Sequence, residues 1–452
     1  MSRLGKDGLR TVPVHRTVPW LIRDPLAGFE RIGRDCDGAL ARLQLGLTRP
    51  YLATHPDHVQ HILRRPEIYR REGMIWRPLR RLEGDGIASE GPSWQTSRRV
   101  LQPLFTARSI GALQPRMAAA VAEVMDMLAD QDRPGQPLDL ITTMTSLVHR
   151  VLIRVFFSDR ISVGQSDRLG GAISTAFQSL GWRMLLPFVG DRVPLPGDRP
   201  FRRAVRTVDE LIYPMIRDGR DRPGGAGGAG GDLDLVTLLA GAVDEHGDRL
   251  AEQRVRDDVV AMFIAGTETT ALALTWLWLL IGSHPEVAGR LSEEVSEVVG
   301  DGPPEPAHLP RLGYTRMVLQ EALRLYPVGW VVPRTVAEPD LLAGVPVRPG
   351  ATVLLSPYLT HRLAEFWEDP YAFRPDRFAV PGARRHRFAY LPFGAGAHQC
   401  LGGHFFLAEG QLAVAGLLSR FRPQLVGQPS TRARATVTLR PRGRPQLLLY
   451  PR

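Results

Sequence analysis

Hydrophobic residues recur at helical spacing over two long parts of the chain. Apolar positions follow a period near 3.6 over residues 92–220 and 250–326, which predicts amphipathic helices. The longest apolar stretch, residues 259–281, is long enough to cross a bilayer. It carries Gly266, Glu268 and several threonines at its middle. The pattern therefore favours a long helix buried in a large core, with a polar function halfway along it.

Short apolar runs separated by turn residues fill the other parts of the chain. Residues 38–56 alternate in this way and predict a small sheet near the start. Further short strands are expected within residues 331–358, a last helix from about 401 to 421, and strand-like segments over 435–439 and 446–450. The prediction is a mainly α fold with a minor β region.

The segment 223–231, PGGAGGAGG, has the composition of a flexible connector. Because helical patterns lie on both sides, we interpret it as a surface loop and not as a domain boundary. No internal repeat is found. We therefore expect residues 1–452 to form a single domain, with a short polar lead over residues 1–16.

Composition excludes several classes of protein. Apolar residues make up 44% and charged residues 23%, the mix of an ordinary globular protein and not of a disordered or fibrous one. Two cysteines, Cys36 and Cys400, cannot form a disulfide framework. The polar lead is followed by no apolar signal region, so we expect a cytoplasmic protein without a transmembrane segment.

The chain is basic, with 57 Lys and Arg against 47 Asp and Glu, a formal net charge of +10. Lys6 is the only lysine, and the arginines are scattered. No basic run is interleaved with aromatic residues, so nucleic-acid binding is not expected. A basic balance also favours association with an acidic protein partner.

The loop around Cys400 carries the most specific chemistry. Residues 393–402 read FGAGAHQCLG, in which Gly394 and Gly396 permit a tight turn and close approach to a flat ligand. A helix predicted to start after Cys400 would place its positive end near the sulfur and favour the thiolate. With no second cysteine or histidine cluster nearby, the loop does not suit structural zinc, but it does suit an axial ligand to haem iron.

This loop resembles the haem-binding loop of the cytochromes P450, the haem-thiolate monooxygenases. The resemblance implies their fold, a triangular helical domain with small sheets, and haem b as the cofactor. It also implies that Cys400 is the iron ligand, that Phe393 packs beside the sulfur and that His398 reaches a haem propionate. Gly394 and Gly402 belong to the same cofactor-binding loop.

Two more motifs resemble the same family and are interpreted as structural. Glu321 and Arg324 stand one helical turn apart, like the E-x-x-R of the family, and can pair on one face of a helix. Residues 373–378, FRPDRF, are similar to its F-x-P-x-R-F. By this resemblance Arg377 completes a Glu–Arg–Arg network behind the cysteine loop.

Three residues are candidates for the haem propionates. Trp94 and Arg98 have i, i+4 spacing and resemble the W-x-x-x-R element of the family. Arg334, which follows Pro333, matches a second propionate arginine of the family. A guanidinium suits this task because its planar fork binds a carboxylate through two hydrogen bonds.

The middle of the long apolar helix is the candidate catalytic segment. Residues 265–270, AGTETT, resemble the oxygen-activating A-G-x-(D/E)-T-(T/S) of the family. The resemblance implies that Gly266 lets the helix open beside the iron, that Thr269 supports oxygen activation and that Glu268 relays protons from solvent. The structural alternative is a satisfied polar patch. The acid–alcohol pair indicates that O2 and an electron-transfer partner are used.

Electrons are expected from separate proteins. Only residues 401–452 follow the cysteine loop, too few for a fused reductase, so we expect a ferredoxin and an NAD(P)H-dependent ferredoxin reductase. In this family the cysteine lies near the surface through which electrons enter. Arg384, Arg385 and Arg387 are candidates to face an acidic ferredoxin, and the alternative is that they are solvated surface charges. A monomer is expected.

The leading hypothesis is a monooxygenase acting on a lipophilic small molecule, with a resemblance to bacterial members that oxidise terpenes. Oxidation of a polyketide- or peptide-derived natural product, ligand binding without turnover, and rearrangement or dehydration without net oxygenation are the alternatives. The residues expected around the substrate are Met74, Ile75, Trp76, Met184, Leu185, Leu186, Phe188, Val328, Trp330 and Val331.

Overall fold

A computed structural model describes most of the chain. The described residues are 3–4, 9–15, 18–19, 24–45, 48–73, 76–130, 135–158, 160–186, 189–190, 192–221, 234–379, 385–428 and 430–452. The predicted connector at 223–231 lies outside them.

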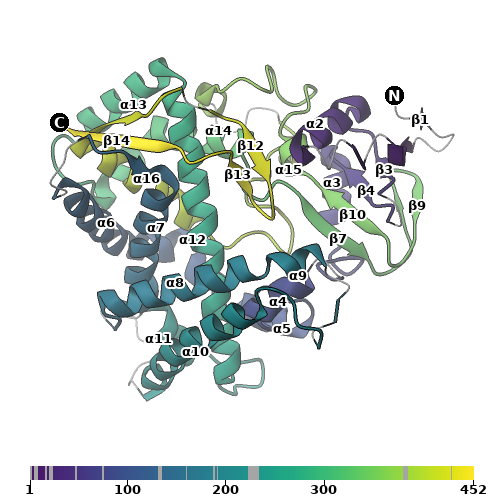
Figure 1. The fold of residues 1–452 in the computed structure, drawn as a ribbon, viewed down its shortest axis with the longest axis horizontal. Coiled ribbons are helices and arrows are strands. Elements are labelled where there is room, and N and C mark those ends of the chain that lie inside the picture. The colour runs from purple at the N-terminus through teal and green to yellow at the C-terminus, as the bar shows by residue number, and fades with distance from the viewer. Residues whose placement is uncertain are drawn as a thin grey trace.

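Helices dominate the described chain, which confirms the predicted fold class (Figure 1). The described α-helices are α2 (Pro25–Cys36), α3 (Pro56–Leu63), α4 (Arg77–Glu83), α5 (Pro92–Leu101), α6 (Ala107–Ala129), α7 (Leu140–Phe157), α8 (Val163–Ser179), α9 (Gly181–Leu185), α10 (Asp198–Asp221), α11 (Leu235–Ala240), α12 (Glu252–Gly282), α13 (Pro285–Val298), α14 (Gly313–Leu325), α15 (Pro357–Thr360) and α16 (Gly403–Arg420). Short 3₁₀ turns are η1 (Gln102–Phe105), η2 (Pro306–Arg311), η3 (Pro375–Phe378) and η4 (Arg387–Ala389).

The strands form one larger sheet and three small ones. The larger sheet has the order β1-β2-β3-β4-β10-β7-β5, and its central β4–β10 pair is parallel. Its strands are β1 (Arg3–Leu4), β2 (Arg10–Val12), β3 (Ala41–Leu43), β4 (Tyr51–Ala53), β5 (Tyr69–Arg70), β7 (Val332–Val336) and β10 (Thr352–Leu355). The small sheets are β11-β14-β6, β12-β13 and β8-β9, made of β6 (Leu138–Asp139), β8 (Asp340–Leu342), β9 (Val345–Val347), β11 (Phe421–Leu425), β12 (Ala433–Ala435), β13 (Leu439–Pro441) and β14 (Gln446–Pro451).

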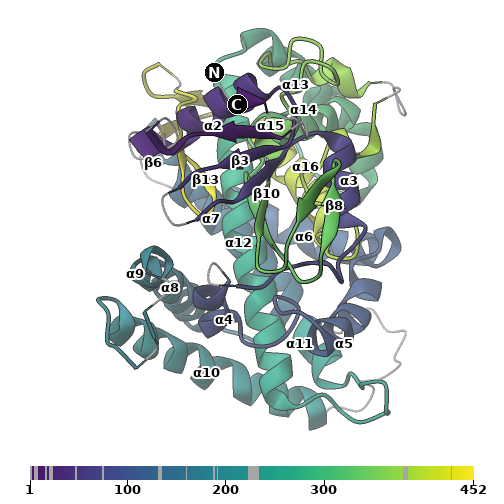
Figure 2. The same cartoon turned by 90° about the vertical axis from the view of Figure 1, so that its right-hand side faces the viewer.

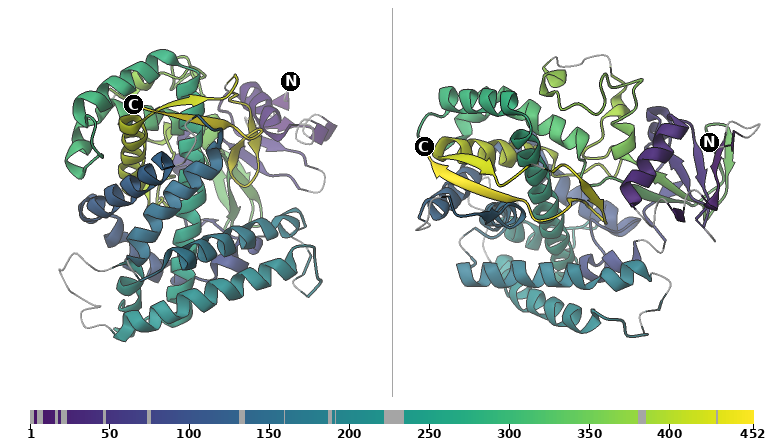
Figure 3. Two further views of the ribbon diagram at one scale, coloured as in Figure 1. Left: turned by 60° about the vertical axis from the view of Figure 1, so that its left-hand side comes forward. Right: turned by 45° about the horizontal axis from the view of Figure 1, so that its top comes forward.

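The helix α12 runs through the middle of the molecule and organises the rest (Figure 1). Helices α8 and α10 lie together across its lower part, while the larger sheet lies to one side with α2 and α3 (Figures 2 and 3). At the other end, Trp276 of α12 stacks on Tyr326 with ring centroids 4.0 Å apart. Its indole N–H donates to Leu439 O over 2.9 Å, so α12 also holds the C-terminal strands.

The apolar surfaces of the two most hydrophobic helices are covered by the chain itself. Helices α7 and α12 are long and apolar enough to cross a membrane by length and composition alone. Within their most apolar windows, 61% and 72% of the residues are buried inside the fold. This agrees with the prediction of a buried core helix for residues 259–281, although α12 begins earlier, at Glu252.

One predicted strand is wrong. Residues 435–439 alternate like a strand, but residues 436–438 form the turn between β12 and β13, and only Ala435 and Leu439 at its ends belong to strands. Both the backbone N–H and the hydroxyl of Thr436 donate to Thr438 O, over 3.0 and 2.6 Å, which closes the turn locally. Because threonine side chains can satisfy backbone groups in this way, the alternation was not specific for an extended chain.

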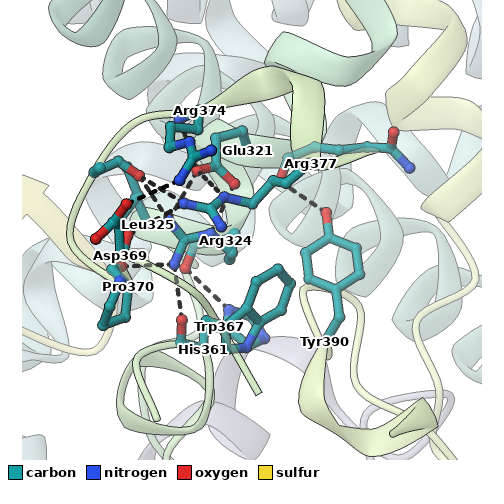
Figure 4. Close-up of polar contacts among 12 residues, drawn as sticks. Glu321, Arg324, Leu325, His361, Trp367, Asp369, Pro370, Arg374, Arg377 and Tyr390 are labelled. Atoms are coloured by element: carbon teal, nitrogen blue, oxygen red, sulfur yellow. Dashed lines mark hydrogen bonds and ion pairs between the residues drawn. The ribbon is translucent and has the colours of Figure 1, made fainter. Parts of the chain in front are cut away.

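A buried ion network fixes the region behind the cysteine loop (Figure 4). The carboxylate of Glu321 accepts two hydrogen bonds from Arg324, over 2.7 and 2.8 Å, and one from Arg377 Nε over 2.9 Å. Glu321 and Arg324 are fully buried. Arg324 also donates to the carbonyls of His361 and Pro370, so its charge is well solvated by the protein. Glu321 and Arg324, which the sequence predicts to pair, and Arg377, which it predicts to join them, are therefore in contact in the fold.

The network reaches the cysteine loop through His361. Its Nε2 accepts from Leu391 N over 2.7 Å, which leaves Nδ1 as the donor to Arg324 O at 3.0 Å. Burial lowers the pKa of His361 to about 3, so the ring stays neutral in this tautomer. His361 thus ties α14 to the residues that lead into the loop carrying Cys400.

We expect Glu321→Ala to lower the free energy of unfolding by about 3–5 kcal/mol, because the buried Arg324 loses its counter-charge. The matched control is Asp126→Ala, which removes the acid from an exposed pair with Arg420 and should cost at most about 1 kcal/mol. Urea denaturation of both variants measures the difference. Equal losses would show that the network contributes no more than a surface pair.

Candidate active site

One cavity of about 480 Å³ brings the predicted site residues together. It lies between α12, α5 and the loop that precedes α16. Of the predicted catalytic and cofactor-binding residues, all except Glu268 line it: Trp94, Arg98, Gly266, Thr269, Arg334, Phe393, Gly394, His398, Cys400 and Gly402. Segments separated by three hundred residues in sequence therefore share one chamber.

The loop before α16 presents the Cys400 sulfur to this cavity. Cys400 N donates to Phe393 O over 2.8 Å, and Gly402 N donates to Cys400 Sγ over 3.3 Å. Gly394 and Gly396 have φ of +65° and +73°, a region that disfavours other residues. A Cβ at Gly396 would also lie 2.2 Å from Leu63 O, so the loop packs against α3 only as glycine.

Two opposing effects act on the pKa of the Cys400 thiol. Burial raises the pKa of the thiol, while the N–H of Gly402 and the charge of Arg98 lower it. Burial is the larger effect, so the start of α16 does not by itself produce a thiolate in the protein alone. Coordination of a metal deprotonates a cysteine outright, and the sulfur is placed for that.

Arg334 is the clearest anion-binding group in the cavity. It is 5% exposed, and among the described residues its only hydrogen-bond acceptor is Pro333 O, at 2.9 Å. Burial and the nearby Arg71 lower the pKa of Arg334 to about 10. A buried guanidinium without an acidic partner is costly, so this site is arranged for an anion supplied by a ligand.

The other predicted anion-binding residues lie close to one another. The rings of Trp94 and His398 are 4.3 Å apart between centroids. Arg98 Nη1 donates to Gln399 O over 2.6 Å, which places this guanidinium beside the cysteine loop. His398 Nε2 lies 3.3 Å from Glu90, a residue that sequence reasoning missed.

These features fit a haem group. A cysteine sulfur faces a largely apolar chamber, and cationic side chains without sufficient acidic partners line the same chamber. A haem carries an iron that needs one axial ligand and two propionates that need cations. Cys400 would hold the iron, and Arg98, Arg334 and His398 would hold the propionates.

The predicted oxygen-activating segment faces the cavity from α12. Thr269 lines it, and its hydroxyl donates back to Ala265 O one turn earlier. A Cβ at Gly266 would lie 3.1 Å from Leu152, so the glycine also permits close packing of α12 on α7. The hydroxyl of Thr269 therefore lies at the cavity and is bonded to its own helix. A ligand that offers another acceptor would have to compete with Ala265 O for this hydrogen bond.

Glu268 points away from this cavity. Its Oε1 accepts from Arg440 Nη2 over 2.6 Å and from Thr438 Oγ1 over 2.8 Å. Both partners lie at the turn and strand β13, about 170 positions later in the sequence. No local signal in the sequence could have shown this pairing, because it depends on how the C-terminal strands pack on α12.

Only some of the residues expected around the substrate line the cavity. Trp76 and Val328 line the cavity. Trp330 does not, because its indole N–H donates to Thr436 O over 2.8 Å and its ring packs on Phe29 in the core. Leu186 and Val331 also lie outside the lining, while Met74, Ile75, Phe188 and the side chains of Met184 and Leu185 lie outside the described residues.

Known proteins resemble this chain over almost its whole length. The family model for cytochrome P450 matches residues 9–449. A cyclooctat-9-en-7-ol 5-monooxygenase from Streptomyces melanosporofaciens is 35% identical, covering 85% of this chain and 82% of that protein. A pentalenene oxygenase from Streptomyces avermitilis is 29% identical, covering 95% and 93%. The crystal structure of the cytochrome P450DA heme domain covers 98% and 97%, at 26% identity and a TM-score of 0.86.

We expect Arg334→Leu to weaken haem retention by about 10–100-fold, because a charge-assisted hydrogen bond to a propionate is lost. The transfer of haem to apomyoglobin measures this directly. Arg348→Leu, at an exposed arginine that follows β9, is the control and should leave the transfer rate unchanged. The same rate in both variants would exclude Arg334 from the cofactor site.

Proposed function

The chain belongs to the cytochrome P450 family and is a monooxygenase of that family; we propose that it oxidises a terpenoid with O2 and electrons from a ferredoxin. The observation that carries this proposal is the position of the Cys400 sulfur in a largely apolar cavity that Thr269 also lines. We further propose that residues 1–452 form one catalytic domain, since the helices pack about α12 in one extended core.

The cofactor is haem in this family, and we propose haem b with Cys400 as its iron ligand. When bound, the haem supplies the reductive activation of O2 and the oxidation of the substrate. Phe393 and the glycines Gly394 and Gly402 shape the loop around the sulfur, while Arg334 and Arg98 would hold the propionates. The protein itself contributes ligation, a dry chamber and the placing of protons.

The proton supply rests on Thr269 and Glu268. Thr269 lines the cavity. The Glu268 carboxylate does not, because it accepts a hydrogen bond from Arg440 on another side of α12. To deliver a proton inward, Glu268 must leave Arg440 and Thr438 and turn along α12. A relay of this kind has no use in a protein that only binds a ligand, so the acid–alcohol pair favours turnover over the non-turnover alternative.

A terpenoid substrate is supported by two observations. The cavity is lined mainly by apolar side chains, which favours a lipophilic ligand. Two relatives bear names of enzymes that act on terpenoids, a cyclooctat-9-en-7-ol monooxygenase and a pentalenene oxygenase. A polyketide- or peptide-derived natural product is the second candidate, because an apolar pocket alone would also accept it.

The proposed redox partner is an acidic ferredoxin reduced by an NAD(P)H-dependent reductase, acting on a cytoplasmic monomer. The formal net charge of +10 supports electrostatic association. Of the three candidate arginines, Arg384 lies outside the described residues. Arg385 is folded inward, with its guanidinium 4.6 Å from the centroid of Trp367 and a hydrogen bond to Arg377 O. Arg387 is exposed, so it is the candidate that the fold leaves available.

We expect Thr269→Ala to bind substrate normally but to lower the yield of product per NAD(P)H by about 10²–10⁴-fold, with peroxide released instead. The physical reason is the loss of a hydroxyl placed to move a proton at the oxygen-binding side of the cavity. Thr267→Ala is the matched control, since its hydroxyl donates to Phe263 O and it does not line the cavity. Coupling at the parent level in Thr269→Ala would contradict the assignment.

We expect reduction by an acidic ferredoxin to slow as salt is raised, because screening sets in beyond about 8–10 Å at 0.1–0.15 M. Arg387→Glu should slow it further at low salt. Arg168→Glu reverses an exposed charge on α8 and should have little effect. Stopped-flow rates that ignore both salt and Arg387 would show that the basic charge does not guide the partner.

A further inference from the structure

A single carboxyl group stands among the side chains that line the cavity. Glu83, the last residue of α4, is the only acidic residue in the lining formed by the described residues. The same lining includes the apolar residues Leu79, Ile87, Ala261 and Met262. Burying a carboxyl group among such side chains is costly unless something compensates it.

The backbone around Glu83 is fixed, so the carboxyl group cannot easily withdraw. Leu82 O accepts from Arg256 of α12 over 3.0 Å, and Asp85 N donates to Asp257 over 3.0 Å. Gly84 has φ of +68°, and a Cβ there would lie 2.0 Å from the Asp257 side chain. The two residues on either side are therefore pressed against α12.

Arg81, two residues before Glu83, is anchored as well. Arg81 donates to Asp198 at the start of α10 over 3.0 Å, and its guanidinium lies 5.0 Å from the ring centroid of Phe201. Arg81 and Leu82 thus face α10 and the core, respectively. Of residues 81–83, only Glu83 lines the cavity.

No group among the described residues satisfies the Glu83 carboxyl. Among the described residues it has no hydrogen bond and no ion pair. Arg71 is the source of opposing charge at Glu83, but its Nε and Nη2 donate to Glu90 and to the carbonyls of Ile87 and Ser89, and no hydrogen bond joins it to Glu83 among the described residues. Burial raises the pKa of Glu83 to about 7, and the charge of Arg71 opposes this rise only in part.

The haem does not account for Glu83. The propionates are carboxylates, so a second carboxyl group beside them would be repelled. Two of the groups proposed to hold them, Arg98 and Arg334, are cationic, and the third, His398, can donate from a ring N–H. Glu83 therefore belongs to the part of the cavity that the substrate occupies.

We propose that Glu83 receives a hydroxyl group of the substrate, so that the enzyme acts on a lipophilic skeleton that already carries an alcohol. The inference rests on the proposed function and names the substrate class more closely. A hydroxyl can donate to the carboxylate and, when the carboxyl is protonated, accept from it, so one substrate suits both states. The hydrogen bond fixes one end of the skeleton and thereby selects which carbon reaches the oxidised position.

A hydroxyl fits better than a protonated amine. An ammonium group needs the ionised carboxylate at all times and would lie near the charge of Arg71. Burying an unpaired ammonium group among apolar side chains also costs more free energy than burying a neutral hydroxyl group. An amine substrate is therefore the competing outcome in the experiment.

The experiment uses the haem-loaded enzyme and three matched probes, farnesene, farnesol and farnesylamine. Equilibrium dissociation constants are measured by the substrate-induced change in the haem spectrum and, independently, by calorimetry. The variants are Glu83→Leu, Glu83→Gln and the control Glu67→Leu, which changes an exposed carboxyl group outside the cavity. We expect the parent enzyme to bind farnesol about 10–100-fold more tightly than farnesene.

Glu83→Leu should abolish this preference and bind both probes alike, whereas Glu83→Gln, which can still accept and donate, should keep most of it. Glu67→Leu should behave as the parent. An unchanged preference in Glu83→Leu would overturn the proposal, and so would tighter binding of farnesylamine than of farnesol that Glu83→Gln removes. Failure of every lipophilic probe to bind would overturn the proposed function and this inference with it.

Discussion

The structure depends on the buried carboxylate of Glu321. Two guanidinium groups bind this fully buried carboxylate, and removing it would leave their charges in the core without a counter-charge. Arg324 also donates hydrogen bonds to the backbone carbonyls of His361 and Pro370, which lie in the turn-rich segment that follows α15. Because these hydrogen bonds anchor both carbonyls to α14, they fix the conformation of a segment that is neither helix nor strand.

That fixed shape is what places the reactive sulfur. His361 joins Arg324 O to Leu391 N, and the chain then reaches Cys400 in nine residues. From the other side, Asp258 of α12 accepts from Ile87 N and Ser97 Oγ, both over 2.7 Å, and so holds the loop between α4 and α5. The cavity is thus framed by two buried networks, one behind the sulfur and one behind the substrate side.

Local sequence patterns predicted much of this arrangement. The helical periodicity located α12, and the spacing of residues in the cysteine loop, at Trp94 and Arg98 and at Glu321 and Arg324 identified groups that do meet in space. Each motif is contained within ten residues and the periodicity within one helix, so these signals can be read without knowledge of the fold.

What the sequence did not predict depends on contacts between distant segments. The pairing of Glu268 with Arg440 joins α12 to β13, and the role of His361 arises only when α14, α15 and the cysteine loop are packed together. Trp330 was expected near the substrate because residues 327–332 resemble a pocket region of the family, but its hydrogen bond to Thr436 and its packing on Phe29 hold it in the core. Nor could the sequence predict that Glu83 lines the cavity without an ion-pair partner among the described residues.

The central claim is that Cys400 binds the haem iron as a thiolate. The most direct measurement is the absorption spectrum of the reduced carbon monoxide complex, compared between the parent, Cys400→His and Cys36→Ala. Cys36 is the matched control, because it is 2% exposed and burial raises the pKa of its thiol to about 11. The account predicts the red-shifted Soret band of thiolate ligation in the parent and Cys36→Ala, and its move to the histidine-ligated position in Cys400→His. A red-shifted band that persists in Cys400→His would contradict the account.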